Sequence, residues 1–326
     1  FVKKSFKHDE DVNDFELYKI YKKIVRNYKI DVILPIGYKS NIFFSKYYNK
    51  FKNFVKIPIS NYKKISLASD KIKTIKFAEK NGIPVPKSFF VKSPTEIKRY
   101  KIKYPVVIKS AKEIMYARNY DELISVLEQK KEFGIQVIQE YIRGPGRGYF
   151  ALCNKGDIVA SFQHQRIRDY PYKGGISSCA KSIYNKELEK LGEKIVKKLN
   201  WHGVIMIEFR YDLKDKKHKL LEINPKFWGS LDLAISSGIS FPTLASKLAM
   251  GYYVDKINKY KVGKKFQWLL PEDTITIKTA KNKIKAIKDY LSDLFNPNVE
   301  KDLGYIFIDP IPTIIRLIWT FIKLLW

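Results

Sequence analysis

Cysteine is scarce in this chain, which carries only Cys153 and Cys179 among its 326 residues. The two lack the paired spacing that builds zinc sites or a disulfide framework, so both kinds of site are excluded. A positively charged start followed by an apolar core is also missing. The chain opens at Phe1 and is expected to have lost its native N-terminus. A reducing, cytoplasmic location is predicted.

Acidic residues are also few: 33 Asp and Glu stand against 62 Lys and Arg, giving a formal net charge of +29. Such a balance favours contact with anions, which include nucleic acids, acidic membranes and phosphorylated ligands. The basic residues are mostly lysines spread over the whole length, with no long arginine tract. We therefore favour a lysine-rich composition that supports solubility, and a nucleic-acid partner is not expected.

The most apolar stretch of the chain is its end, "IPTIIRLIWTFIKLLW" at 311–326, which is charged only at Arg316 and Lys323. It is shorter than the roughly 20 residues that span a bilayer. Two interpretations stay open. In the favoured one the segment is a helix packed on the body of the protein. In the other it lies on an anionic membrane surface, which its basic residues and two tryptophans would suit; the protein would then be cytoplasmic and membrane-associated through peripheral contact.

What the chain does have is a large apolar content, 45% hydrophobic and 14% aromatic residues, which is typical of a folded protein. Its length suggests roughly two domains. Helical spacing at 10–28 followed by a buried parallel strand at 31–37 predicts the end of an N-terminal open α/β domain over 1–65, with its start missing. The fold class predicted is mixed α/β and α+β.

A small α+β lobe is expected at about 87–142, within a segment assigned to 66–142. The segment begins with a helix that Ser66 or Ser69 would cap and Gly82 would end. Two strands, "YPVVIKS" and "IMYAR", a helix capped by Asn119 and a third strand, "IQVIQEYI", follow.

A larger lobe is assigned to 143–250. It contains a hairpin turning at "NKGD", the amphipathic helix "KELEKLGEKIVKKLN" and two strands around the turn "LKDKKH". A C-terminal extension takes 251–326.

Two strands of the larger lobe, 204–210 and 219–224, carry a pair of carboxylates. Met206, Glu208 and Arg210 are expected on one face of the first, and Leu220, Glu222 and Asn224 on one face of the second. With the turn centred near Asp215, Glu208 falls opposite Glu222, and opposed like charges destabilise a sheet. A solvated sheet face is one explanation. The other is magnesium, because two carboxylates and an amide oxygen are the hard ligands that this ion takes, often together with a nucleotide phosphate.

Two lysines could serve the phosphates of such a nucleotide. Lys71 lies at a predicted helix start, and Lys109 ends an apolar strand, where an inward-facing ammonium would need an anionic partner. The alternative for each is a solvated surface charge.

Several short motifs follow one another in the order and spacing of a known superfamily: "SDK", "NGIPVP", "YPVVIKS", "VIQEYIRG", "HQRIRDYP", "GVIMIEF" and "LLEINPKFWGS". They resemble the ATP-grasp superfamily, specifically its carboxylate-amine ligases of the carbamoyl-phosphate-synthase-like large-subunit fold. The resemblance covers about residues 31–250. It implies an ATP-grasp fold with ATP and Mg²⁺, or Mn²⁺, held between a small lid lobe and a larger antiparallel-sheet lobe.

The resemblance also implies a role for particular residues. The magnesium ligands would be Glu208, Glu222 and Asn224. The ATP contacts would be Lys71 and Lys109 at the phosphates and, at the adenine, the backbone of Glu140, Tyr141 and Ile142 with the side chain of Gln139.

In such ligases the γ-phosphoryl group passes to a substrate carboxylate, and an amine then attacks the acylphosphate, with release of ADP and phosphate. The phosphoryl step requires positioning and charge neutralisation rather than a protein nucleophile. Arg166 and Arg168, expected on one strand face, suit a carboxylate or acylphosphate oxygen, and Lys226 matches a position where the family commonly has arginine. An exposed hairpin edge is the alternative for both arginines. Gly174 and Gly175 could add an anion-binding turn.

The chain departs from the family in two places. The segment after Lys109, "KSAKEIMYAR", lacks the usual glycine-rich lid, so Ser110 and Lys112 would have to replace it. Lys226 loses the bidentate phosphate contact of an arginine. A kinase of the same fold acting on a small molecule and a nucleotide-binding protein with little catalysis therefore stay open beside the ligase. The expected partners are a small-molecule carboxylate and amine, and an oligomer is allowed.

Overall fold

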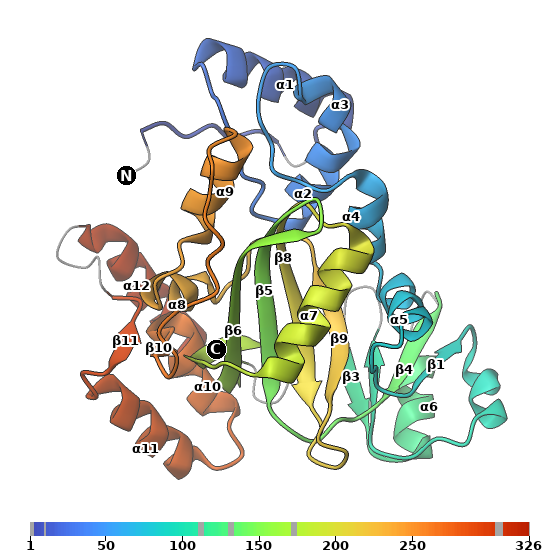
Figure 1. Ribbon diagram of the computed structural model, residues 1–326. Helices are drawn as coiled ribbons and strands as arrows, with labels where there is room; N and C mark the ends of the chain where they lie inside the picture. Colours follow the sequence, from blue (N-terminus) through green and yellow to red (C-terminus); the bar gives the residue numbers. More distant parts are fainter. Residues whose placement is uncertain are drawn as a thin grey trace.

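The computed structural model describes residues 3–9, 11–109, 114–129, 134–170, 175–303 and 309–325. Figure 1 shows a large sheet at the centre of the molecule, a smaller sheet on one side of it and the C-terminal segment on the other, with the N-terminal helices at one end. Helices combined with mainly antiparallel sheets confirm the mixed fold class. The residue boundaries proposed for the four segments stay a prediction.

The N-terminal segment is helical: α1 (Asp14–Asn27), α2 (Tyr38–Lys46), α3 (Tyr48–Phe51) and α4 (Tyr62–Ser69). The helix predicted at 10–28 is confirmed. The strand predicted at 31–37 is wrong, because in this segment the structure has only an isolated parallel bridge between Val32 and Lys56. Pro35 and Pro58 lie close to that bridge and have no N–H for a longer ladder.

Helix α5 (Lys71–Lys80) is separated from α4 by the single residue Asp70. Its N-cap is Asp70, whose side chain accepts hydrogen bonds from the N–H groups of Ile72 and Lys73 at 2.9 and 3.0 Å. The cap predicted at Ser66 or Ser69 is wrong, since both lie within α4 and the Asp70 carboxylate satisfies two free N–H groups of the new helix. The predicted stop is confirmed by Gly82, whose φ is +60°.

The small lobe contains β1 (Ser88–Val91), the short helix η1 (Pro94–Arg99), β2 (Val106–Lys109), β3 (Ile114–Ala117), α6 (Tyr120–Glu128) and β4 (Gln136–Glu140), with strand order β1-β4-β2-β3. Asn119 caps α6 by accepting a hydrogen bond from the Glu122 N–H at 2.8 Å, as predicted. Leu123 and Leu127 of α6 are fully buried in the core of this lobe. The predicted strand, strand, helix and strand are therefore confirmed.

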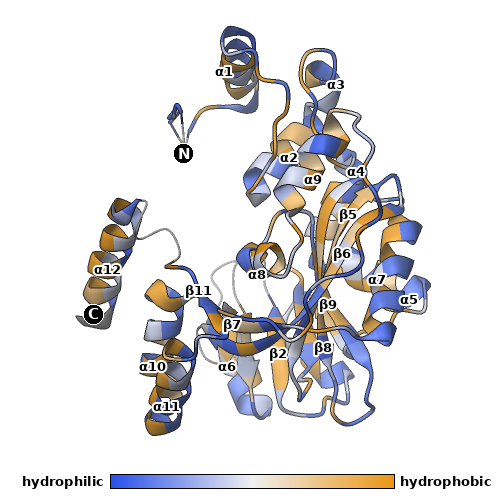
Figure 2. Ribbon diagram, turned by 60° about the vertical axis from the view of Figure 1, so that its left-hand side comes forward, coloured by the Kyte–Doolittle hydropathy of each residue, from blue (hydrophilic) through white to orange (hydrophobic). Residues whose placement is uncertain are grey.

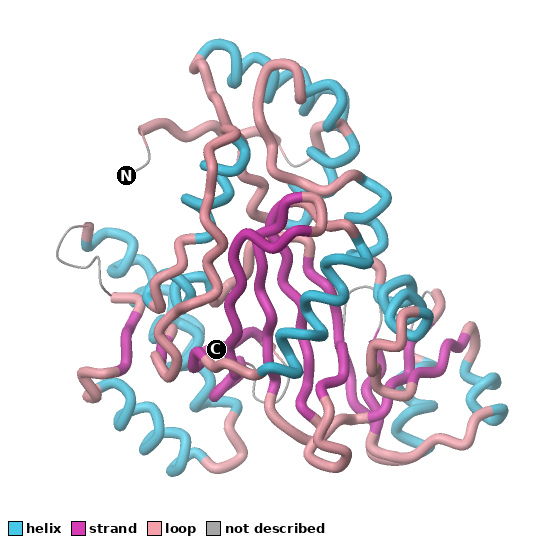
Figure 3. Tube along the Cα trace, viewed as in Figure 1, coloured by secondary structure: helices cyan, strands magenta, loops and turns pink. Residues whose placement is uncertain are grey.

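The large sheet has strand order β11-β10-β7-β6-β5-β8-β9. Its inner strands are β5 (Gly146–Asn154), β6 (Asp157–Tyr170), β7 (Ile176–Ser182), β8 (Gly203–Tyr211) and β9 (His218–Asn224). Helix α7 (Lys186–Leu199) covers one face (Figure 3) and buries Leu188, Ile195 and Val196 there. Gly192 of α7 allows this close packing, because a Cβ there would lie 2.3 Å from the Tyr149 ring.

The opposite face of the large sheet packs partly against α8 (Leu231–Ser236) and α9 (Phe241–Ala249). The C-terminal extension adds β10 (Lys265–Gln267), η2 (Leu269–Asp273), α10 (Thr274–Thr279), α11 (Lys283–Leu294), β11 (Val299–Lys301) and α12 (Pro310–Leu325). Strand β10 pairs with β7 antiparallel and with β11 parallel. The C-terminal extension thereby continues the large sheet. Its residues consequently lie close to the face of that sheet opposite α7.

One buried histidine makes the fold sensitive to acid. His164 on β6 is buried, and neither of its ring nitrogens has a hydrogen-bond partner among the described residues. Burial, with a smaller contribution from the Arg166 charge, lowers the pKa of His164 from 6.5 to about 3. Because the folded-state pKa lies below the unfolded value, the stability that this neutral histidine contributes is complete above pH 6.5 and is lost as the pH falls towards 3.

We expect this loss to reach about 1.4 kcal/mol per pH unit over that window. His164→Leu should therefore flatten the fall in unfolding free energy measured in urea between neutral pH and about pH 5. The pH dependence of the unfolding free energy is compared rather than its absolute value, because the cost of repacking leucine at the site is the same at every pH. A slope as steep as that of the wild type would show that other groups account for the acid sensitivity.

Candidate functional site

A cavity of about 490 Å³ opens between the two sheets. It is bounded on the small-lobe side by β2, β3 and the end of β4, and on the large-lobe side by β6, β8 and β9. Eight of the twelve residues that the sequence nominates for a site line it: Lys109, Gln139, Glu140, Tyr141, Ile142, Arg166, Glu208 and Glu222. The fold thus brings together side chains that are distant in the sequence.

The two carboxylates meet across the β8–β9 ladder. Glu208 pairs directly with Glu222, which is the register that the turn near Asp215 predicts. The expected position of Leu220 is wrong, however, because the register shifts after Glu208 and Phe209 pairs with Leu220, leaving Leu221 as an extra residue. Leu220 consequently lies in the hydrophobic core with Phe209, on the other face from Glu222.

Glu208 is held in a charged, buried setting. Arg166 on β6 donates a hydrogen bond from Nη2 to Glu208 Oε2 at 2.7 Å. Burial raises the pKa of Glu208 to about 7; Arg166 opposes the rise, while Glu222 and Asp169 add to it. A bound cation would favour the ionised form of this carboxyl.

Asn224 completes the group expected to bind magnesium. It donates a hydrogen bond from Nδ2 to Glu222 Oε1 at 2.8 Å, which orients the amide beside the carboxylate pair. Within the described ranges, no three His, Cys, Asp or Glu side chains cluster in a way that could hold a metal ion. The candidate metal site therefore consists of two carboxylates and one amide oxygen, a donor set that suits a hard cation with further ligands from a phosphate or water.

Lys109 faces this acidic group from the small lobe. It ends β2, is buried and donates a hydrogen bond from Nζ to the Leu221 carbonyl at 3.3 Å, so the extra residue in β9 supplies its contact. Burial lowers the pKa of Lys109 to about 8, and the charges of Glu222 and Glu208 counteract part of that effect. A phosphate beside Lys109 would restore its full charge.

Lys71, the second lysine of the predicted pair, starts α5 and lines a separate cavity of about 460 Å³. Burial lowers the pKa of Lys71, and the charge of Glu222 raises it. The charge of Glu222 therefore raises the pKa of both lysines, although Lys71 does not line the cavity between the sheets.

The segment that leaves β4 offers hydrogen-bonding groups at the edge of the cavity. Gln139 donates from Nε2 to Ser88 Oγ at 2.8 Å, while its buried Oε1 has no partner among the described residues. The Tyr141 N–H already donates to the Pro105 carbonyl at 3.3 Å. The Ile142 N–H donates to no residue in the described part of the chain. An unpaired buried acceptor and an available N–H fit the amino group and ring nitrogen of an adenine edge.

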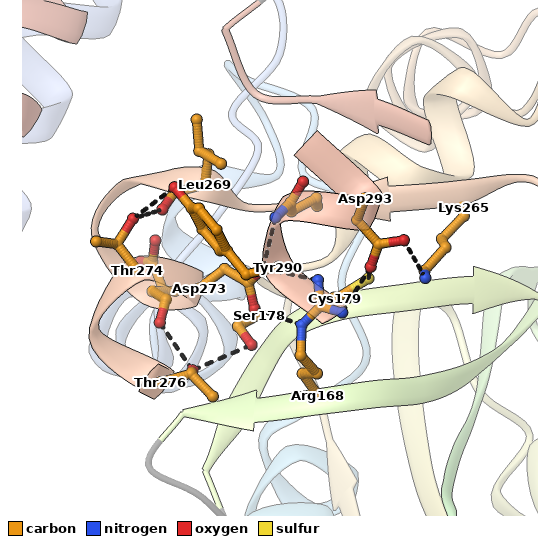
Figure 4. A network of polar contacts seen from close by, with 12 residues as sticks. Arg168, Ser178, Cys179, Lys265, Leu269, Asp273, Thr274, Thr276, Tyr290 and Asp293 are labelled. Atoms are coloured by element: carbon orange, nitrogen blue, oxygen red, sulfur yellow. Dashed lines mark hydrogen bonds and ion pairs between the residues drawn. The ribbon is translucent and has the colours of Figure 1, made fainter. Parts of the chain in front are cut away.

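The two arginines of β6 do not share a face. Arg166 reaches Glu208, but Arg168 lies in the buried ion-pair network shown in Figure 4. Arg168 donates to both oxygens of Asp273 at 2.8 and 2.7 Å and to Asp293 at 2.5 Å. The expectation of a common face is wrong because the register between β6 and β7 shifts on either side of Arg168. The structure places Arg168 at the junction with the C-terminal extension, away from the cavity.

Lys226 and Asn224 line a second cavity of about 240 Å³ that adjoins the carboxylates. Lys226 donates from Nζ to its neighbour's carbonyl, on Phe227, at 3.4 Å. Sequence reasoning missed two residues of this cavity, Trp268 and Glu272, which come from the C-terminal extension. No motif marks them; only the pairing of β10 with β7 reveals their position.

The segment proposed to cover the phosphates lies partly outside the described residues, as do Ser110, Lys112 and Gly174. Gly175 is described, and its carbonyl accepts a hydrogen bond from Arg166 Nη1 at 2.6 Å. Together with Glu208, this contact fixes the direction of the Arg166 guanidinium between the two cavities.

Comparison with known proteins decides the family. A family profile described as an ATP-grasp domain matches residues 68–230, which is half of the 326 residues. The chain belongs to the ATP-grasp family. The resemblance inferred from the motifs is thereby confirmed.

Individual relatives agree with this assignment to the ATP-grasp family. The carbamoyl phosphate synthase large chain of Thermoanaerobacter pseudethanolicus is 24% identical over an alignment of 242 residues that covers 64% of this chain and 21% of that protein. The D-alanine–D-alanine ligase of Carboxydothermus hydrogenoformans is 29% identical over an alignment of 217 residues that covers 57% of this chain and 69% of the ligase. This chain thus spans about a fifth of the carbamoyl phosphate synthase chain.

Among solved structures, the fold is similar to the biotin carboxylase domain of the Hydrogenobacter thermophilus 2-oxoglutarate carboxylase, in complex with MgADP, ADP and bicarbonate. The TM-score is 0.62 at 16% identity, covering 76% of this chain and 60% of that one. At this identity the likeness shows the ATP-grasp fold alone.

Proposed function

We propose that the protein is an ATP- and magnesium-dependent ligase that joins a carboxylate to an amine through an acylphosphate and releases ADP and phosphate. One observation carries the proposal: Glu208 and Glu222 oppose each other across β8 and β9 and face Lys109 across a cavity between the two lobes of an ATP-grasp fold. Opposed carboxylates are unfavourable alone and favourable around a cation that carries nucleotide phosphates.

The cavity of about 490 Å³ falls in the range usual for small-molecule sites. Adenine would lie against the segment from Glu140 to Ile142, where the Ile142 N–H and the Gln139 Oε1 are available. The phosphates would extend towards Lys109, whose buried ammonium lacks a carboxylate within salt-bridge distance among the described residues. Desolvated, preorganised cations stabilise phosphoryl charge more strongly than solvated ones do.

Glu208, Glu222 and Asn224 would hold the magnesium ion, which when bound neutralises charge on the phosphoryl oxygens. Arg166 keeps its guanidinium between the metal ligands and the second cavity through its contacts with Glu208 and Gly175. From there it can orient a substrate carboxylate for attack on the γ-phosphoryl group. Lys226 supplies a further positive charge in the same cavity.

The second cavity is proposed for the acceptor molecules. It combines the cations Arg166 and Lys226 with the indoles Trp228 and Trp268 and the carboxylate Glu272. Cations suit the acid substrate, and a carboxylate suits an ammonium group, so one small cavity offers contacts for both reactants. The C-terminal extension completes its wall.

Turnover of ATP to ADP with pools of small metabolites tests the proposal, followed by mass measurement of the product. A ligase given its true acid and hydroxylamine should form a hydroxamate, because hydroxylamine traps an acylphosphate. A kinase would instead give a stable phosphorylated product. MgATP that raises the melting temperature without ADP release from any pool would indicate nucleotide binding without catalysis.

A further inference from the structure

Helix α12 packs on the protein through its polar side. Thr313 and Thr320 are buried, while most of the intervening residues are exposed. Arg316, one turn from each, contacts the Asp302 carboxylate and the Leu270 carbonyl and lies 3.7 Å from Glu272. These contacts fix the rotation of α12 about its own axis, because turning it over would leave buried Asp302 without its cation.

The side of α12 that faces away is apolar. Ile314, Ile315, Ile318, Trp319, Phe321 and Ile322 each keep 46–64% of their surface exposed. Figure 2 shows α12 at the edge of the molecule, coloured largely as hydrophobic. A helix on the surface of a water-soluble domain normally has the opposite arrangement, with its apolar stripe inward. Contiguous exposed apolar side chains of this kind mark an interaction surface.

Helix α11 has the same character. Ile284, Ile287 and Leu291, with Phe295 directly after the helix, recur at helical spacing and are 41–78% exposed. Exposed lysines at 283, 285 and 288 lie among them. Apolar side chains and lysines therefore occur together on two helices of the C-terminal extension.

We propose that α12 docks the protein on an anionic lipid surface, lying in the plane of the interface. No helix in the described part of the chain is long and apolar enough to cross a membrane, so insertion would be shallow. The net charge favours a lipid surface over a second copy of the chain as the partner of α12. A lipid surface of opposite sign attracts a chain of net charge +29, whereas a second copy would bring another +29 against it.

Two details of α12 fit an interface. Trp319 lies on the exposed side, and the Lys323 ammonium is 3.8 Å from the centre of its ring. Aromatic rings and long basic side chains are the usual residues at the boundary between acyl chains and head groups. The proposal does not depend on the reaction catalysed, because no residue of α12 lines the cavity between the lobes.

Flotation of the full chain with vesicles tests the proposal. Binding is expected on phosphatidylglycerol-containing vesicles, much less on pure phosphatidylcholine, and salt should weaken it. The double variant Ile315→Glu with Ile318→Glu should lose at least about tenfold in vesicle affinity, since two apolar groups leave the bilayer and two negative charges approach it. Its melting temperature should not change, because both side chains face solvent.

Leu213→Glu is the matched control: Leu213 is 62% exposed but follows β8, remote in sequence from α11 and α12, and its substitution should leave flotation unchanged. The proposal is overturned if the wild type ignores anionic vesicles, or if the double variant binds them equally well. It is also overturned if sedimentation shows a dimer that the double variant abolishes, since a second copy would then cover α12.

Discussion

Glu222→Gln is expected to lower magnesium-dependent ATP affinity by at least about a hundredfold, since even partners outside the ligand shell of a metal commonly contribute ten- to a hundredfold. Glutamine keeps the size of the side chain and can still accept the Asn224 hydrogen bond, but it lacks the charge that a hard cation requires. The fold should be unaffected or slightly more stable, because a carboxylate opposite Glu208 disappears. Titration calorimetry with MgATP measures the affinity in the presence of magnesium, and titration with ATP in EDTA measures the affinity without it.

Glu300→Gln on β11 serves as the control for Glu222→Gln. Glu300 is exposed and pairs with Lys264 at 2.6 Å, far from the carboxylate pair in the strand order. Its loss should leave affinity for MgATP within experimental scatter. If Glu222→Gln bound MgATP as tightly as the wild type, the β8–β9 hairpin would not be the metal site, and the proposed function would lose its main support.

Arg168→Met is expected to lower the free energy of unfolding by about 3–5 kcal/mol. The substitution removes the cation from between Asp273, which is fully buried, and Asp293, which is nearly so. Lys265 would still pair with Asp293 at 2.5 Å, but among the described residues Asp273 would retain only the Gln267 amide at 2.7 Å. Urea unfolding measures the loss, and affinity for MgATP per folded molecule should stay close to that of the wild type.

Arg99→Met provides the comparison for a solvated arginine. Arg99 is mostly exposed and lies 3.8 Å from Glu96, so its removal should cost less than about 1 kcal/mol. If Arg168→Met matched this mild effect and yet abolished ATP turnover, Arg168 would belong to the catalytic site, as the motif predicts, rather than to the junction that the structure shows.

Local patterns in the sequence predict most of the hairpin that carries the carboxylates. Alternation with period two, a polar turn and the count of residues between the strands suffice to place Glu208 opposite Glu222. The same reasoning fails at 31–37, because a short apolar run looks alike whether or not a neighbouring strand exists to pair with it.

Contacts between distant segments could not be predicted in this way. Arg168 meets Asp273 and Asp293, which are 105 and 125 residues further along the chain. Trp268 and Glu272 reach the second cavity only because β10 joins the sheet beside β7. Nothing near these residues in the sequence signals either contact, whereas the lysine at the end of β2 is recognisable by its apolar strand.

The extra residue in β9 decides which side chains of that strand face the core. Leu220 and Ile223 lie in the hydrophobic core, whereas Glu222 and Asn224 line the cavities; without the register shift at Leu221, Leu220 and Glu222 would share one face. Leu221 lines the cavity between the lobes, and it provides Lys109 with a backbone carbonyl, which any amino acid would supply. The register shift therefore matters at this point in addition to the side chain at 221, since regular pairing through Leu221 would direct either Leu220 or Glu222 to the wrong face.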